Sequence, residues 1–286
     1  MPEYTQEYLN RGADRIGLQI YPEPKGVVDA PAVVIWPAMG VPAGYYRRFA
    51  TALHDAGFAV IVADLRGTGT STPRPRRSAN VCYSDLVADV RAVQESLKSR
   101  LDGRRRILLG HSLGGQVALL HLALAEDPMV DGLVLLAVGL PYWRLYPRLM
   151  RYGVLAVTQG ITATAALLGV WPGWGFGGRQ SRGVIRDWAH TARTGHFPII
   201  NGVDPEKAMQ SVRTPVLAVS MDDDLYTPQE TLDQLCSKLT AAPVQREHYT
   251  VAQAGAPLGH FAWVRSSAGL VTHIADFTAG LPASRW

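Results

Sequence analysis

The stretch RILLGHSLGGQVALLHLALA, residues 106–125, decides the fold class of this chain. Its first apolar run, Ile107 to Leu109, does not alternate with polar residues, which is typical of a strand buried on both faces. The alanine- and leucine-rich run after Gly115 has helical character. Between the two runs lies one serine, Ser112, with small residues on both sides. The stretch therefore predicts a buried strand, a tight turn that carries Ser112, and a helix that follows at once.

Strand-like and helix-like segments alternate along most of the chain. Short apolar runs that predict further strands lie at residues 32–40, 58–64, 131–139 and 214–222, with a last strand at 246–251 and an edge strand at 14–22. Helices are expected at residues 44–56 and 82–101. This alternation favours an α/β fold with a mostly parallel central sheet flanked by helices. In such sheets, ligands bind beyond the carboxyl ends of the strands.

Residues 140–213 break this alternation. They contain a glycine-rich run at 171–178 and four of the seven tryptophans, Trp143, Trp171, Trp174 and Trp188. We interpret 140–213 as a helical cap inserted into a core that residues 1–139 and 214–286 form. Wide indole surfaces line apolar pockets well, so Trp143 and Trp171 are candidates for contact with a substrate. The alternative is that the tryptophans only pack the cap onto the sheet.

Composition limits the classes of function. The 286 residues are 47% hydrophobic and 18% charged, with a net charge of +4, as in ordinary globular proteins. There is no basic helix face with interleaved aromatic residues, so we expect no nucleic-acid partner. Two distant cysteines, Cys82 and Cys236, predict neither a metal site nor a disulfide, and they favour a reducing compartment. With no signal-peptide pattern at the start, we expect a cytoplasmic protein.

The most membrane-like segment is residues 154–170. It is short for a membrane span and includes Gln159, Gly160 and several threonines, so no stable membrane insertion is expected. A buried or lid helix is the favoured interpretation, and an interfacial contact with lipid is the alternative.

The pattern Gly110-x-Ser112-x-Gly114, between a strand and a helix, matches a nucleophile elbow. The segment GFAVIVADLRGTGTS, residues 57–71, resembles the strand–Asp–x–Arg–Gly–x–Gly–x–Ser stretch of the α/β-hydrolase superfamily. The chain resembles that superfamily over nearly its whole length, in the branch of serine aminopeptidases and monoacylglycerol lipases. The resemblance implies the α/β-hydrolase fold, and a catalytic triad in the chain order Ser, Asp or Glu, His.

The same resemblance implies which residues complete the triad. In VSMDDDLYTP, residues 219–228, Asp224 stands four residues before Pro228, as in the superfamily's Asp-x-x-x-Pro. Asp224 is the expected acid, with Asp223 as the alternative. Of the eight histidines, His260 follows the last predicted strand through a loop with Gly and Pro, and is the expected base.

Acyl transfer also needs two backbone N–H groups that bind the oxyanion. Leu113, directly after the nucleophile, is expected to supply one. The other should come from the loop after residues 33–36, where Pro37 has no N–H to donate. Met39 is the candidate by register, and Ala38 is the alternative.

Together these residues predict a serine hydrolase that cleaves an ester, thioester or amide of a small-molecule acyl substrate through an acyl-enzyme. The acyl group is expected to be apolar or aromatic. An acyltransferase would use the same triad, and a non-catalytic binding protein can share the fold. No metal ion or organic cofactor is implied, and the oligomeric state is not predicted.

Overall fold

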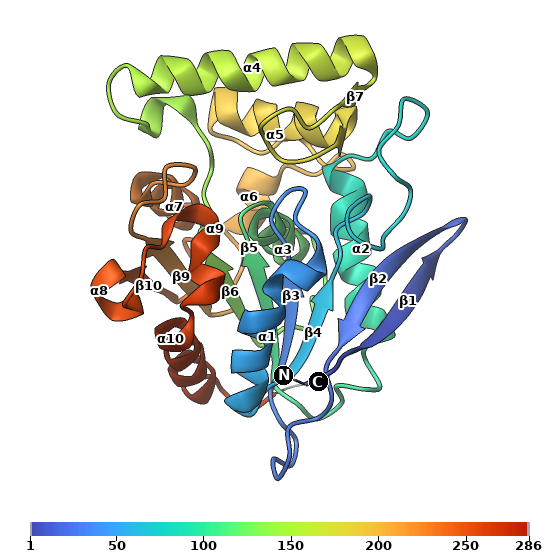
Figure 1. The fold of residues 1–286 in the computed structure, drawn as a ribbon, viewed down its shortest axis with the longest axis vertical. Coiled ribbons are helices and arrows are strands. Elements are labelled where there is room, and N and C mark those ends of the chain that lie inside the picture. Colours follow the sequence, from blue (N-terminus) through green and yellow to red (C-terminus); the bar gives the residue numbers. More distant parts are fainter. Residues whose placement is uncertain (1, 285–286) are drawn as a thin grey trace.

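The computed structural model describes residues 2–284, which build one eight-stranded sheet with the strand order β1-β2-β4-β3-β5-β6-β9-β10 (Figure 1). Six strands, from β4 to β10 in that order, run parallel, and β1 and β2 form an antiparallel hairpin at one edge. The strands are β1 Thr5–Arg11, β2 Asp14–Ile20, β3 Ala32–Trp36, β4 Ala59–Ala63, β5 Arg106–His111, β6 Gly132–Leu136, β9 Val216–Met221 and β10 Val244–Tyr249. The predicted mostly parallel sheet is confirmed.

Both faces of the sheet are buried, which explains the apolar runs without alternation. In β3, Val34 packs into the apolar core on one face, and its neighbours Val33 and Ile35 pack into the core on the other. One face is covered by α2, α3 and α7, and the opposite face by α1 and α10. These helices are α1 Arg47–Asp55, α2 Tyr83–Ser96, α3 Leu113–Leu124, α7 Gln229–Cys236 and α10 Ala268–Ala279.

Several predicted boundaries differ from the structure. The helix predicted at 82–101 is α2, which ends at Ser96 and is followed by turns. The segment predicted as one helix at 44–56 begins with a 3-10 turn, Ala43–Tyr46, before α1. The last strand ends at Tyr249, not at residue 251, because Thr250 starts the short helix α8, Val251–Ala254. There, the Thr250 side chain accepts a hydrogen bond from the N–H of Gln253, so the backbone turns away from the sheet.

Residues 140–213 contain α4 Met150–Leu168, α5 Arg182–Thr194, α6 Pro205–Met209, the 3-10 turn Trp143–Leu145 and a small hairpin of β7 Val170–Trp171 and β8 Gln180–Ser181. Figure 1 shows α4 at the top of the molecule, lying across α5 on the side away from the sheet. The helix α6 instead lies against α3 of the core. No helix formed by residues 2–284 is both long enough and apolar enough to span a membrane.

The crossing of β5 and α3 leaves no space for side chains at the glycines of the opening stretch. A Cβ atom at Gly114 would lie 2.1 Å from the carbonyl oxygen of Trp36, and one at Gly110 would lie 2.2 Å from the Cα of Gly115. These neighbours are backbone atoms of the central strands and of α3, which cannot move without shifting the sheet. The glycines therefore set the distance between strand and helix.

We expect Gly114→Ala to lower the free energy of unfolding by about 1–3 kcal/mol or more, because the added methyl group overpacks the crossing. The control is Gly160→Ala in α4, where a Cβ atom would meet nothing within 4 Å. In that helix, alanine should instead stabilise the protein by up to about 1 kcal/mol. Urea unfolding of both variants measures the two effects, and equal stabilities would contradict this account of the crossing.

Candidate active site

Ser112 lies at the turn between β5 and α3, with φ 52° and ψ −121°. A non-glycine residue in this left-handed region is strained, and the strain is held by the surrounding backbone. The N–H of Ser112 donates to the carbonyl of Leu136 at 3.3 Å, and its own carbonyl accepts from the N–H groups of Gly115 and Gln116. The turn thus presents the Ser112 hydroxyl at the carboxyl ends of the strands.

The structure brings Ser112, His260 and Asp224 together in one hydrogen-bonded chain. Nε2 of His260 lies 3.0 Å from Oγ of Ser112, and Nδ1 of His260 lies 2.8 Å from Oδ2 of Asp224. A carboxylate can only accept, so Nδ1 of His260 carries the proton. In the neutral imidazole, Nε2 is then the acceptor for the Ser112 hydroxyl. His260 and Asp224 are each only 6% exposed, so water competes little for these contacts.

Asp224 is held in the turn after β9 by three further donors. Its Oδ1 accepts from the backbone N–H groups of Tyr226 and Thr227, each at 2.9 Å, and its Oδ2 accepts from the Thr227 hydroxyl at 2.6 Å. Burial by itself raises the pKa of Asp224, but the hydrogen bonds and charge of His260 and the donors of Thr227 outweigh it. The pKa of Asp224 is therefore below its ordinary value, and the group is ionised near neutral pH.

The two neighbouring aspartates point elsewhere. Asp222 pairs with Nε2 of His248 at 2.9 Å and accepts from the N–H of Val251 at 2.8 Å. Asp223 is exposed and has a φ of 59°, as a turn residue does. Only Asp224 of the three contacts His260, as the sequence pattern predicts.

The N–H groups near the Ser112 hydroxyl come from Leu113 and from the loop after β3. The N–H of Ala38 donates to the Tyr46 hydroxyl at 2.9 Å, and that hydroxyl lies 2.7 Å from Nδ1 of the buried His111. The N–H of Ala38 therefore points to Tyr46 in the core and is not free to bind a group in the cavity. Within residues 2–284, the backbone N–H groups of Met39 and Leu113 have no protein acceptor, and both residues line the cavity described next.

A cavity of about 790 Å³ extends from Ser112 and His260 to the cap. Most of its lining is apolar, and none of the described residues that line it is Asp, Glu, Lys or Arg. Its large side chains include Met39, Leu113, Tyr146, Val154, Phe176 and Trp188. Such a cavity suits an uncharged, apolar ligand.

The structure does not place Trp143 or Trp171 in this cavity. Trp171 is buried in the cap, where its indole N–H donates to the carbonyl of Phe176 at 2.8 Å, and Trp143 lies half-buried beside Tyr152. The tryptophan that faces the cavity is Trp188. A sequence signal existed for it, because Trp188 shares a helix face with other apolar residues of α5, spaced by three and four.

Residues 2–284 contain no group of three or more His, Cys, Asp and Glu side chains that could hold a metal ion.

Comparison with known proteins supports the same architecture. The family model described as serine aminopeptidase, S33, matches residues 29–252. The AB hydrolase superfamily protein YisY of Bacillus subtilis is 36% identical over 95 residues, which are 33% of this chain and 33% of YisY. The chain covers between 33% and 42% of the length of the curated relatives it matches.

Among solved structures, a soluble variant of monoglyceride lipase from Saccharomyces cerevisiae is similar, with a TM-score of 0.72 at 14% identity, over 97% of this chain and 96% of that chain. Est1E from Butyrivibrio proteoclasticus with bound ferulic acid has a TM-score of 0.65 at 16% identity, over 96% of this chain and 99% of that chain. At these identities, the likeness concerns the fold.

Because the folded state lowers the pKa of Asp224, the ionised group stabilises the protein above its ordinary pKa, and this contribution is lost as the pH falls through the lowered pKa. We therefore expect Asp224→Asn to reduce the free energy of unfolding near neutral pH, and the deficit to shrink below about pH 4. Urea unfolding over a pH series measures this. The control, Asp223→Asn, removes an exposed carboxylate without a contact to His260 and should cost less at neutral pH. Equal deficits for both variants at neutral pH would contradict the assignment.

Proposed function

The chain belongs to the serine aminopeptidase S33 family of α/β-hydrolases, and from that premise we propose that it is a serine hydrolase with Ser112 as its nucleophile. The observation that carries the proposal is the hydrogen-bonded chain from Ser112 through His260 to Asp224. A serine hydroxyl is a weak nucleophile until a base accepts its proton, and His260 lies at hydrogen-bond distance for that transfer.

In the proposed reaction, Oγ of Ser112 attacks the carbonyl carbon of the substrate while its proton passes to Nε2 of His260. Asp224 stabilises the imidazolium and keeps its orientation. The oxyanion accepts hydrogen bonds from the N–H groups of Met39 and Leu113. His260 then gives its proton to the leaving group, and an acyl-enzyme remains. A water molecule then attacks the acyl carbon while its proton passes to Nε2 of His260. His260 gives this proton to Oγ of Ser112 as the ester bond breaks, which releases the acid and restores the Ser112 hydroxyl.

The lining of the cavity supports an uncharged acyl group as the substrate's main recognition element. A substrate with a free amino terminus needs a carboxylate partner, and the cavity lining offers none. The carboxylate of Asp224 is 6% exposed and is bound by His260 and Thr227. We therefore propose an ester, thioester or amide with an apolar acyl group, and not an amino-terminal peptide.

The test is intact-mass analysis after treatment with a fluorophosphonate, which reacts only with an activated serine. We expect one adduct per chain, and no adduct on Ser112→Ala or His260→Ala. Circular dichroism shows whether each variant is folded. An adduct of equal yield on folded Ser112→Ala would overturn the assignment of the nucleophile, and no adduct on the parent protein would overturn the proposed function.

Tyr46 gives a second prediction, because its hydroxyl accepts the N–H of Ala38 and so fixes the Pro37–Ala38 peptide, next to the peptide that carries the Met39 N–H. Removal of an oxyanion donor costs about 100- to 1,000-fold in kcat, so a misplaced donor in Tyr46→Phe should cost at least about tenfold. KM for a short ester should change little. The control is Tyr249→Phe, another buried tyrosine, whose hydroxyl donates to the carbonyl of Ser266 and not to the loop after β3. If both variants keep the parent kcat, Tyr46 does not position the loop.

A further inference from the structure

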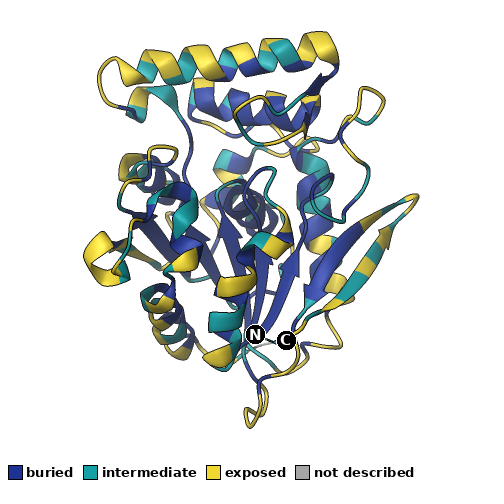
Figure 2. Ribbon diagram, viewed as in Figure 1, coloured by how far each residue is buried: buried dark blue, intermediate teal, exposed yellow. Residues whose placement is uncertain are grey.

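The helix α4 exposes mainly apolar residues to solvent, unlike an ordinary surface helix. Surface helices of globular proteins turn charged and polar residues to solvent. In α4, all exposed residues are glycine, apolar residues or tyrosine: Met150, Tyr152, Gly153, Ala156, Val157, Gly160, Ala163, Ala166, Leu167 and Leu168. Its single charged residue, Arg151, and its threonines and glutamine are less exposed. Figure 2 shows these exposed residues recurring along α4, at the top of the molecule. We call these ten residues the outer face of α4.

The outer face of α4 continues into the rim of the cavity that contains Ser112. Four residues with large side chains both line this cavity and are exposed: Met150 at 41%, Val157 at 58%, Leu225 at 69% and Tyr226 at 46%. Next to them, Leu149 is 83% exposed. Large exposed apolar areas of this kind mark binding surfaces on soluble proteins. An apolar molecule could pass from the outer face of α4 into the cavity without crossing a charged surface.

The charge around this face is positive. Residues 132–186 include six arginines and no Asp or Glu. Residues 140–213 contain nine basic and three acidic residues, whereas the rest of the chain contains 19 basic and 21 acidic residues. Two of the three acids have cationic partners, since Asp187 pairs with Arg186 at 2.8 Å and Glu206 pairs with Lys238. The net positive charge of the protein therefore lies on the cap.

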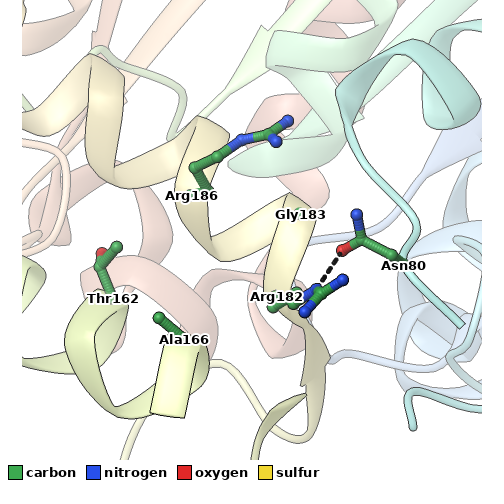
Figure 3. A pocket seen from close by; sticks show the side chains of 6 residues that line it. All are labelled: Asn80, Thr162, Ala166, Arg182, Gly183 and Arg186. Atoms are coloured by element: carbon green, nitrogen blue, oxygen red, sulfur yellow. Dashed lines mark hydrogen bonds between the residues drawn. The ribbon is translucent and has the colours of Figure 1, made fainter. Parts of the chain in front are cut away.

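Arginines lie at both ends of α4. At its start, Arg144 and Arg151 stack over the rings of Trp143 and Tyr152 at 5.1 and 5.0 Å, and Arg148 is exposed between them. At its other end is a second cavity, of about 230 Å³, where Thr162 and Ala166 of α4 face Arg182 and Arg186 of α5 (Figure 3). Segments that lie in a membrane interface typically combine apolar and aromatic side chains with arginines beside them.

We propose that the outer face of α4 docks on an anionic lipid surface, and that an apolar substrate enters the cavity from that surface. The uncharged face would enter the boundary between headgroups and acyl chains, and the arginines around it would contact anionic headgroups. A second copy of the chain fits less well, because symmetric contact would bring the arginines of one cap against those of the other. The entry of substrate rests on the proposed function, whereas the docking does not.

The docking is tested with full-length Ser112→Ala, so that the protein cannot consume the lipid. Its binding to vesicles of phosphatidylcholine with about one quarter phosphatidylserine is measured by flotation, beside vesicles of phosphatidylcholine alone. We expect at least about tenfold tighter binding to the anionic vesicles, and loss of that preference at high salt. Equal or absent binding to the two vesicles would overturn the proposal.

The face itself is tested by adding Ala163→Glu and Leu167→Glu to this protein. Both positions are exposed and neither lines the cavity, so the fold should persist. We expect at least about a tenfold loss of binding to anionic vesicles. The matched control is Val27→Glu with Val28→Glu, which makes the same change of net charge in the exposed loop between β2 and β3, at the end of the molecule opposite α4 (Figure 1), and it should bind as the parent does. Equal loss in both variants would show an effect of net charge alone and overturn the proposal. A dimer that only the α4 variant dissociates would make this face a self-interface instead.

With Ser112 restored, the α4 variant should turn over a water-soluble short ester at the parent rate. It should cleave an apolar ester embedded in anionic vesicles at least about tenfold more slowly. Vesicle binding without any turnover would contradict the proposed function and leave the docking intact. Turnover of the soluble ester without vesicle binding would contradict the docking and leave the proposed function intact.

Discussion

The close crossing of β5 and α3 is the constraint on which the rest of the site depends. Gly110 and Gly114 allow the strand and the helix to approach until backbone meets backbone, as the blocked Cβ positions show. That approach holds the residue between the two elements in a left-handed conformation. It also leaves the N–H of Leu113 without a protein acceptor, at the cavity that contains the Ser112 hydroxyl. A larger side chain at either glycine would push β5 and α3 apart. This would displace both the Ser112 hydroxyl and the Leu113 N–H from their present positions.

The buried side chain of His111, at the end of β5, supports the loop after β3 through Tyr46. His111 is fully buried, and burial, with the nearby His260 adding to it, lowers its pKa well below the ordinary value. Nδ1 of an uncharged His111 can accept a hydrogen bond from the Tyr46 hydroxyl. The oxygen of that hydroxyl in turn accepts a hydrogen bond from the N–H of Ala38. Because His111 also packs against His260, with ring centroids 4.9 Å apart, its neutrality avoids a second positive charge beside the proposed base.

The sequence predicted those features that local pattern determines. The glycines around Ser112 predict the elbow because backbone sterics act within a few residues, and the uninterrupted apolar runs predict strands buried on both faces. The positions of Asp224 and His260 came from resemblance to a superfamily, since their sequence distance from Ser112 carries no information about contact. The sequence left Met39 and Ala38 open as the proposed oxyanion donor. What favours Met39 is that the Tyr46 hydroxyl accepts the N–H of Ala38, and Tyr46 lies several residues away along the chain.

The cap was less predictable than the core, for a physical reason. A count of tryptophans does not show which of them faces inward, and packing decides that only once α4 and α5 are placed. Trp143 and Trp171 pack within the cap, while Trp188 faces the cavity from the apolar side of α5. The segment from residue 154 to 170 was open to two interpretations in the sequence, because it is mainly apolar but contains a glutamine and several threonines. In the structure, Thr158 is buried, and Gln159, Thr162 and Thr164 are partly exposed.

The left-handed conformation of Ser112 sets stability against chemistry at a single position. Glycine has no Cβ and adopts a φ near 52° without strain, so this backbone conformation is best suited to a residue that has no side chain and therefore no hydroxyl. Selection for stability alone would therefore favour glycine over serine at this position. In the proposed function, Ser112 is kept there at the expense of folding free energy.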